Sequence, residues 1–118
     1  MIRNVAAIIF TVRDLNKACD FYQKKLELEL KYKNNKTGWA EFDINGLRFS
    51  LKQSQPFGNG SNPVVSLYTE NLERTVEKYK NKGVKFTDDG SIKSEFYGNT
   101  INLKDPDGNI INLFESSR

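Results

Sequence analysis

Few residues in this sequence could carry out chemistry by themselves. The chain has no histidine and a single cysteine, Cys19. A nucleophilic cysteine needs a neighbouring base to form the reactive thiolate, and imidazole is the usual one. We therefore interpret Cys19 as a small apolar residue on the buried face of a helix rather than as a catalytic residue. A single cysteine also excludes an internal disulfide.

The remaining candidates lie close together in the first half of the chain. Trp39 and Glu41 fall on one face of a strand expected over 39–44, because successive side chains of a strand point to opposite faces. Arg48 follows in the next expected strand. Trp39 could stack on a flat ligand, and Glu41 with Arg48 could orient its polar groups. Alternatively, Glu41 and Arg48 form an ordinary cross-strand ion pair, and Trp39 covers a cleft rim or a dimer contact.

The composition is typical of one globular domain. The 118 residues are 37% hydrophobic and 28% charged, and no apolar run is long enough to span a membrane. The net charge is +3, and the basic residues are mixed with acidic ones along the chain. No nucleic-acid-binding motif accompanies them. We therefore expect neither a nucleic-acid nor a membrane partner. The first ten residues lack a signal-peptide cleavage site, so we expect a cytoplasmic protein.

The elements expected along the chain form the same series twice. In the first half we expect a strand buried on both faces at 5–12 and a helix that is capped by Asp14 and begins at residue 15. Three further strands follow at 29–32, 39–44 and 47–53. In the second half we expect a strand at 64–68 and a helix at 72–82 that is capped by Asn71 and stops at Gly83. Three further strands follow at 84–86, at about 96–103 and from residue 110.

Two turns align these copies. Asn45-Gly46 and the longer Asp105-Pro106-Asp107-Gly108-Asn109 each lead into an apolar strand, and both use residues suited to a tight reversal. The helix caps are 57 positions apart and the turn glycines 62, so the second copy carries about five extra residues. The sequence predicts an α+β fold of two tandem β-α-β-β-β modules in a single domain: module 1 at about 1–54, a linker at about 55–63, and module 2 at about 64–118. Each module would leave one sheet face uncovered, which must pack against another module.

The doubled unit resembles the glyoxalase / bleomycin-resistance / extradiol-dioxygenase group, the vicinal oxygen chelate superfamily. The resemblance covers nearly the whole chain and is carried by Val12-Arg13-Asp14-Leu15, by the following Phe21-Tyr22, and by the final Asp105–Asn109 turn. It implies two curved half-sheets around a cleft. In the enzymes of this group, His, Glu or Gln side chains from the first and last strand of each module bind a metal ion there.

The four positions that the resemblance assigns to metal ligands do not carry such residues. They are Ala7, Ser50, Val64 and Asn112. Ala and Val cannot coordinate a metal, Ser is a poor neutral ligand, and Asn offers only a carbonyl oxygen. We therefore expect no metal and no other cofactor. The chain is similar to the metal-free binding branch typified by bleomycin-resistance proteins, homodimers that sequester a drug in the cleft.

The resemblance also orients the strands, because the ligand positions face the cleft. On this basis we expect side chains from both modules to contact a ligand, namely Trp39, Glu41, Arg48, Ser50, Lys52, Ser66, Tyr68, Asn102, Asn112 and Phe114. Thr100 is also expected to face inward, and Tyr97 to lie near the entrance. This mixture of aromatic and charged groups favours an anionic or zwitterionic, partly aromatic small molecule. The alternative for the second module is a wet sheet face of satisfied polar side chains.

Three functional hypotheses follow. The first is a metal-free protein that binds an antibiotic or a metabolite. The second is an enzyme, a glyoxalase-like lyase or isomerase or a dioxygenase-related enzyme with an atypical site, in which Glu41 is the candidate general base. The third is a non-catalytic interaction module with a vestigial cleft. We expect a homodimer, and the sequence leaves open whether modules pair within one chain or are exchanged between chains.

Overall fold

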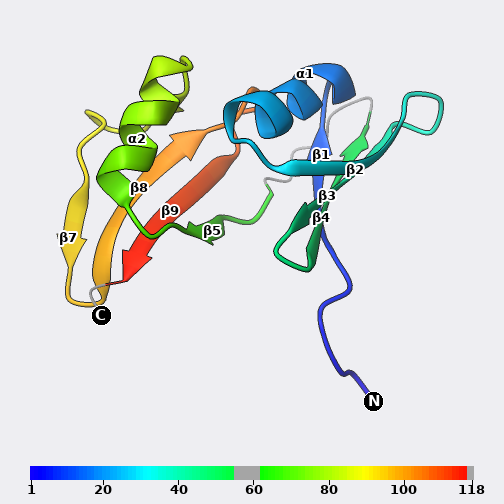
Figure 1. The fold of residues 1–118 in the computed structure, drawn as a ribbon. Coiled ribbons are helices and arrows are strands. Elements are labelled where there is room, and N and C mark those ends of the chain that lie inside the picture. Colours follow the sequence, from blue (N-terminus) through cyan, green and yellow to red (C-terminus); the bar gives the residue numbers. More distant parts are fainter. Residues whose placement is uncertain (55–61, 117–118) are drawn as a thin grey trace. The chain divides into compact units, whose positions relative to one another are not determined.

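The computed structural model describes residues 1–54 and 62–116, so residues 55–61 of the predicted linker lie outside the described part. The chain divides into two compact units, Met1–Asn62 and Pro63–Arg118 (Figure 1). Within the described residues, no helix has the length and apolar character needed to cross a membrane.

The first unit is a four-stranded sheet with one helical segment. Its elements are β1 (Ile8–Val12), α1 (Leu15–Asp20), the π-helical turn η1 (Phe21–Lys25), β2 (Glu29–Asn34), β3 (Trp39–Ile44) and β4 (Leu47–Gln53). The strand order is β1-β4-β3-β2, with β1 parallel to β4 and the other pairs antiparallel.

The second unit repeats this arrangement. Its elements are β5 (Val65–Tyr68), α2 (Leu72–Asn81), β6 (Lys85–Phe86), β7 (Lys93–Glu95), β8 (Gly98–Lys104) and β9 (Ile110–Ser116). The strand order is β5-β9-β8-β6, again with a parallel first pair, and the additional strand β7 also pairs with β8. The predicted α+β fold of two tandem modules is confirmed.

Equivalent contacts begin the two helices. The side chains of Asp14 and Asn71 each accept a hydrogen bond from the backbone N–H three residues later, both at 3.1 Å, as predicted for N-caps. The last strand of each unit supplies a second cap. Gln53 Oε1 accepts from the Leu15 N–H, and Glu115 Oε1 accepts from the Leu72 N–H, both at 2.8 Å. Each helix is therefore fixed to the final strand of its own unit.

The predicted turns and the end of α2 form as expected. Asn45 and Gly46 both have positive φ, 50° and 95°, as in the tight hairpin that an Asn-Gly pair favours. In the longer turn, the buried Asp105 carboxylate accepts from the backbone N–H groups of Asp107 and Asn109. Gly83, with φ +81°, ends α2 in the left-handed conformation.

Three predicted elements differ in the structure. The strand expected over 5–12 starts at Ile8 and is buried on one face only, since Ile9 is 50% exposed. The ladder with β4 begins at the pair Ile8–Phe49, and residues before Ile8 are not paired with β4. The helix from residue 15 changes at Phe21 to a π-helical turn, in which the Leu26 N–H bonds to the Phe21 carbonyl.

The third difference concerns the strand expected over about 96–103. Its first two residues, Phe96 and Tyr97, instead form the tip of a hairpin that joins β7 to β8. Strand β8 begins at Gly98, which has φ +147°. A Cβ atom there would lie 2.1 Å from the Glu115 carbonyl oxygen and 3.0 Å from the Phe114 ring, so only glycine allows this close approach.

Each helix covers one face of its sheet. In the first unit, Phe10, Tyr22, Phe42 and Phe49 form a buried cluster with ring centroids 5.0–6.4 Å apart. The second core is aliphatic and consists of Leu72, Val76, Ile101, Leu103, Ile111 and Leu113. Cys19 is buried, as its interpretation as a helix-face residue predicts, and burial raises the pKa of its thiol. The opposite, helix-free face of each sheet carries polar side chains together with exposed apolar ones such as Ile9 and Tyr68.

The free edge of β1 contacts a side chain in place of a further strand. Asn62 Oδ1 accepts from the Thr11 N–H at 3.1 Å, and Asn62 Nδ2 donates to the Thr11 carbonyl at 3.0 Å. The Asn62 amide thus forms the pair of hydrogen bonds that a residue of a neighbouring antiparallel strand would form.

Candidate ligand-binding surfaces

The strand register brings the predicted residues of the first unit onto its helix-free face. Trp39 lies opposite Lys52, and Glu41 lies opposite Ser50. Their strand neighbours Ala40, Phe42, Phe49 and Leu51 are buried on the helix side. The alternation expected from the sequence therefore describes this sheet, while a role in ligand binding stays a prediction.

Trp39, Glu41 and Arg48 form a connected group. The Trp39 indole N–H donates to Glu41 Oε2 at 2.8 Å, and Arg48 Nε lies 3.7 Å from Glu41 Oε1. Both oxygens of Glu41 thus have partners. The Glu41 side chain is 25% exposed and that of Arg48 is 58% exposed. The Arg48 Nη groups have no partner among the described residues and can donate to a ligand.

A cavity of about 350 Å³ lies beside this group. It is lined by Ala6, Lys31, Glu41, Phe42, Asp43, Gly46 and Arg48. Lys31 was not predicted as a site residue. It sits where the pairing of β2 with β3 shifts register between Leu30 and Tyr32, and a register shift of this kind is not visible in sequence alternation. Lys31 pairs with Glu29 at 2.6 Å, and this hydrogen bond raises the pKa of Lys31.

Ser50 differs from its neighbours on this face. It is 0% exposed, and its hydroxyl has no hydrogen-bond partner among the described residues. In the sheet it lies between Ile9 of β1 and Glu41 of β3. A buried hydroxyl without a partner is costly, so Ser50 is an unusual residue of this sheet.

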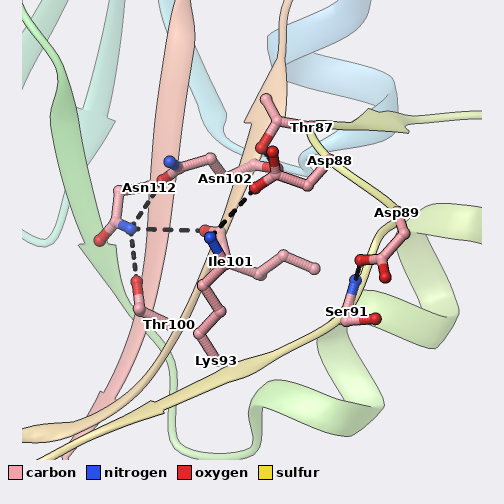
Figure 2. A network of polar contacts seen from close by, with 9 residues as sticks. All are labelled: Thr87, Asp88, Asp89, Ser91, Lys93, Thr100, Ile101, Asn102 and Asn112. Atoms are coloured by element: carbon pink, nitrogen blue, oxygen red, sulfur yellow. Dashed lines mark hydrogen bonds and ion pairs between the residues drawn. The ribbon is translucent and has the colours of Figure 1, made fainter.

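Asn112 is the centre of a polar network on the helix-free face of the second unit (Figure 2). Its amide nitrogen donates to Thr100 Oγ1, to Asn102 Oδ1 at 2.8 Å and to the Ile101 carbonyl at 3.4 Å. Its Oδ1 accepts from the Ser66 hydroxyl at 2.7 Å. The predicted residues Ser66, Asn102 and Asn112 are thus brought together.

A row of aromatic rings follows next to this network. The ring centroids of Tyr68 and Phe114 are 6.3 Å apart, and those of Phe114 and Tyr97 are 5.8 Å apart with an interplanar angle of 31°. Tyr68 and Phe114 are register partners, and Thr100 continues the row on β8. Phe96, 94% exposed, contacts Tyr97 at the hairpin tip. The predicted residues Tyr68 and Phe114 therefore lie together, while Phe96 was missed as a surface residue.

A small cavity of about 50 Å³ lies at the outer edge of β8, where β6 has ended and β7 has not begun. Its lining combines predicted and unpredicted residues: Thr87, Asp88, Ser91, Lys93, Thr100, Ile101, Asn102 and Asn112. Figure 2 shows Lys93 and Asp88 paired, at 3.2 Å. Sequence reasoning missed Thr87, Asp88, Ser91 and Lys93 because they belong to the extra segment of the second copy, which has no counterpart in the first.

The positions implied for a metal do not fit one. Ala7 and Val64 have no donor atom, and Ser50 offers only a buried neutral hydroxyl. The Asn112 carboxamide is already engaged by Ser66, Thr100 and Asn102. Across residues 1–54 and 62–116, no three His, Cys, Asp or Glu side chains gather in an arrangement that could hold a metal ion.

Solved structures of other proteins share the fold of this chain. The fosfomycin resistance protein FosX from Listeria monocytogenes is similar over 99% of this chain and 96% of its own, with a TM-score of 0.81 and 21% identity. The antibiotic binding protein TnmS3 from Streptomyces sp. CB03234 is similar over 99% and 100%, with a TM-score of 0.76 and 22% identity. At these identities the likeness shows the fold alone.

A curated relative and a family model extend the comparison to the sequence. The uncharacterized protein YraH of Bacillus subtilis (strain 168) is 23% identical in an alignment that covers 88% of this chain and 91% of the relative. Residues 4–113 match the family model described as Glyoxalase/Bleomycin resistance protein/Dioxygenase superfamily. Because that match spans nearly the whole chain, this protein belongs to the glyoxalase/bleomycin resistance protein/dioxygenase superfamily.

Proposed function

We propose that this protein binds a small molecule, an antibiotic or a metabolite, and does so without a metal ion. The observation that carries the proposal is the state of Asn112. This residue occupies a position that the family resemblance assigns to a metal ligand, and its carboxamide is committed to Ser66, Thr100 and Asn102. At the position of a metal ligand, this chain therefore has a residue that is the centre of an internal hydrogen-bond network.

The free groups of the first unit support an anionic or zwitterionic ligand. Two Arg48 Nη groups are available, and a guanidinium pairs with a carboxylate or phosphate through two parallel hydrogen bonds. The adjacent Glu41 and Asp43 would accept from a cationic group of the same ligand. Trp39, fixed by its bond to Glu41, offers an aromatic surface beside them.

The nature of the structural relatives supports an antibiotic as one class of ligand. One is a fosfomycin resistance protein and another is an antibiotic binding protein. The same relatives support binding or resistance over the alternative of an interaction module. The enzyme alternative assigns the role of base to Glu41, whose two oxygens interact with Trp39 and Arg48 in this structure.

A thermal-shift screen of antibiotics and charged aromatic metabolites tests the proposal. A ligand present at 100 times its Kd should stabilise the protein by about 2.7 kcal/mol. Arg48→Ala should weaken a hit at least tenfold, because a charge-assisted hydrogen bond contributes about 1.5–3 kcal/mol. The matched control is Arg74→Ala on α2, which should leave the affinity within about twofold.

Elemental analysis of the dialysed protein provides the opposing test. The proposal predicts no stoichiometric Zn, Ni, Mn or Fe. One equivalent of such a metal, together with an activity that a chelator abolishes, would establish the enzyme hypothesis in its place.

We also propose that the protein assembles as a homodimer. Each sheet is covered by a helix on one face only, so the other face, which carries exposed side chains such as Ile9 and Tyr68, can be covered by a second copy. Sedimentation equilibrium measures the mass directly. A monomer at all concentrations would contradict this proposal without affecting the one on ligand binding.

A further inference from the structure

The helix-free face of the second unit has an aromatic row and an amide row side by side. Tyr68 and Phe114 are register partners, and two residues away along the same strands Ser66 and Asn112 are register partners. On β8 the two rows continue as Thr100 and Asn102. A strand rises about 3.3 Å per residue, so the rows lie roughly 7 Å apart.

The aromatic row is a preformed platform. The Phe114 ring lies 5.8 Å from the Tyr97 ring at an interplanar angle of 31°, and 6.3 Å from the Tyr68 ring at 56°, so Phe114 and Tyr97 form the flatter part of the row. Its ring is seated against Gly98, where any side chain would collide with the Phe114 ring and the neighbouring backbone. Aromatic rings contribute large contact areas at low entropic cost, and a flat ring stacks on them favourably. The platform therefore suits a planar aromatic group.

The amide row has one side-chain donor without a partner among the described residues. The Asn112 nitrogen and oxygen are both engaged, Thr100 donates to the Leu113 carbonyl, and Ser66 donates to Asn112. Asn102 accepts from Asn112 through Oδ1, and its Nδ2 group has no partner among the described residues. A primary amide nitrogen can only donate. The Asn102 Nδ2 group is therefore available to donate to a bound ligand.

The charge of the site indicates that this acceptor is neutral. The two rows consist of hydroxyls, amides and aromatic rings, and Lys93, which lines the adjoining cavity, is paired with Asp88. The adjoining cavity of about 50 Å³ has room for a group of a few atoms, and Asn102 and Thr100 line it. A carbonyl group attached directly to a stacked ring, together with its hydrogen bond, spans the distance of roughly 7 Å between the rows.

We propose that the helix-free face of the second unit binds a planar aromatic ring bearing an uncharged carbonyl group. The ring stacks on Phe114 and Tyr97 with its edge toward Tyr68, and the carbonyl oxygen accepts a hydrogen bond from Asn102 Nδ2. This inference rests on the proposed small-molecule function and adds a second recognition surface, on the second unit, for an uncharged aromatic group.

The test is a titration of the ¹⁵N-labelled full-length protein, followed by amide NMR shifts. The probe is 2-naphthamide, and cyclohexanecarboxamide, which has the same carboxamide on a non-planar ring, is the comparison. We expect 2-naphthamide to shift amides around Tyr68, Asn102 and Phe114, and cyclohexanecarboxamide to bind at least fivefold more weakly.

Two variants separate the two halves of the interaction. Asn102→Asp keeps the acceptor for Asn112 but removes the donor, and should weaken 2-naphthamide about fivefold or more. Tyr97→Leu, at the exposed hairpin, should weaken it by a similar factor without disturbing the core. Asn35→Asp introduces the same charge in a turn of the first unit and should leave the affinity within about twofold.

The inference would be overturned by the absence of shifts at about 1 mM probe, by shifts confined to other surfaces, or by equal binding of the two carboxamides. Equal loss in Asn102→Asp and Asn35→Asp would also refute it. A failure here differs from a failure of the proposed function. If a screened compound binds with a change in the fluorescence of Trp39, the single tryptophan, while 2-naphthamide shifts no residue of the second unit, the function stands and this inference is wrong.

Discussion

Ser50→Ala should stabilise the protein, although most substitutions of buried residues destabilise. Ser50 is fully buried in the centre of β4, and its hydroxyl has no partner among the described residues. Folding therefore removes the hydroxyl from water without returning a hydrogen bond. Alanine keeps the Cβ atom, removes the hydroxyl, and creates only a very small void.

The magnitude follows from the cost of an unsatisfied buried group, about 1–3 kcal/mol. Part of this is offset by lost van der Waals contacts of the removed oxygen, so we expect a net gain of about 1–2 kcal/mol. For a chain of this size, each kcal/mol raises Tm by about 3–6 °C. The equivalent change in the second unit, Asn112→Ala, should have the opposite sign. It would leave the hydroxyl and amide groups of Ser66, Thr100 and Asn102 without their shared partner.

Urea unfolding at equilibrium, followed by circular dichroism, measures both changes. Ser94→Ala, an exposed serine of strand β7, is the matched control and should change stability by less than about 0.5 kcal/mol. A loss of stability in Ser50→Ala beyond that of the control would show that the hydroxyl is satisfied, and the reasoning would fail. A gain in stability accompanied by weaker ligand binding would identify Ser50 as a contact retained for function.

Three further changes have defined outcomes. Gly98→Ala should destabilise the protein by more than about 2 kcal/mol in the same urea assay, because its Cβ would lie 2.1 Å from the Glu115 carbonyl oxygen; a neutral result would contradict the close approach. Gln53→Ala and Glu115→Ala should each cost about 0.5–2 kcal/mol through loss of a helix cap, and equal effects would support the equivalence of the two units. Cys19 should react with a thiol reagent only on unfolding, because burial raises the pKa of its thiol and blocks access; rapid labelling of the native protein would refute this.

Much of the fold could be predicted because its signals are local. Asp14 and Asn71 cap the helices, and Gly83 ends the second one, through bonds spanning a few residues. The Asn45-Gly46 turn depends only on the conformational freedom of its own residues. With strand alternation added, these signals were enough to identify two equivalent modules.

The parts that were not predicted depend on contacts distant in sequence. Phe96 and Tyr97 have strong strand preference, but Gly98 is held against Glu115 and Phe114, and the chain reverses just before it. The second caps are another example, since Gln53 and Glu115 bond to residues 38 and 43 positions away. Their separation of 62 positions equals that of the turn glycines, and this common offset could have revealed them.

The site shows the same division. Alternation correctly assigned Trp39 and Glu41 to one face, and Arg48 joins them through an ion pair that was one of the two interpretations considered. Which polar groups satisfy one another depends on side-chain geometry. The sequence therefore could not indicate that Asn112 is fully engaged while Asn102 Nδ2 and the Ser50 hydroxyl are not.

The contact between Asn62 and Thr11 has a consequence for behaviour in concentrated solution. An exposed strand edge can recruit an identical strand from another molecule and begin a growing β-structured aggregate. At Thr11 both backbone groups that such a strand would use are already bonded to the Asn62 side chain. The Asn62 amide thus protects this position of the strand edge against edge-to-edge aggregation, and Asn62→Ala would expose the Thr11 backbone groups.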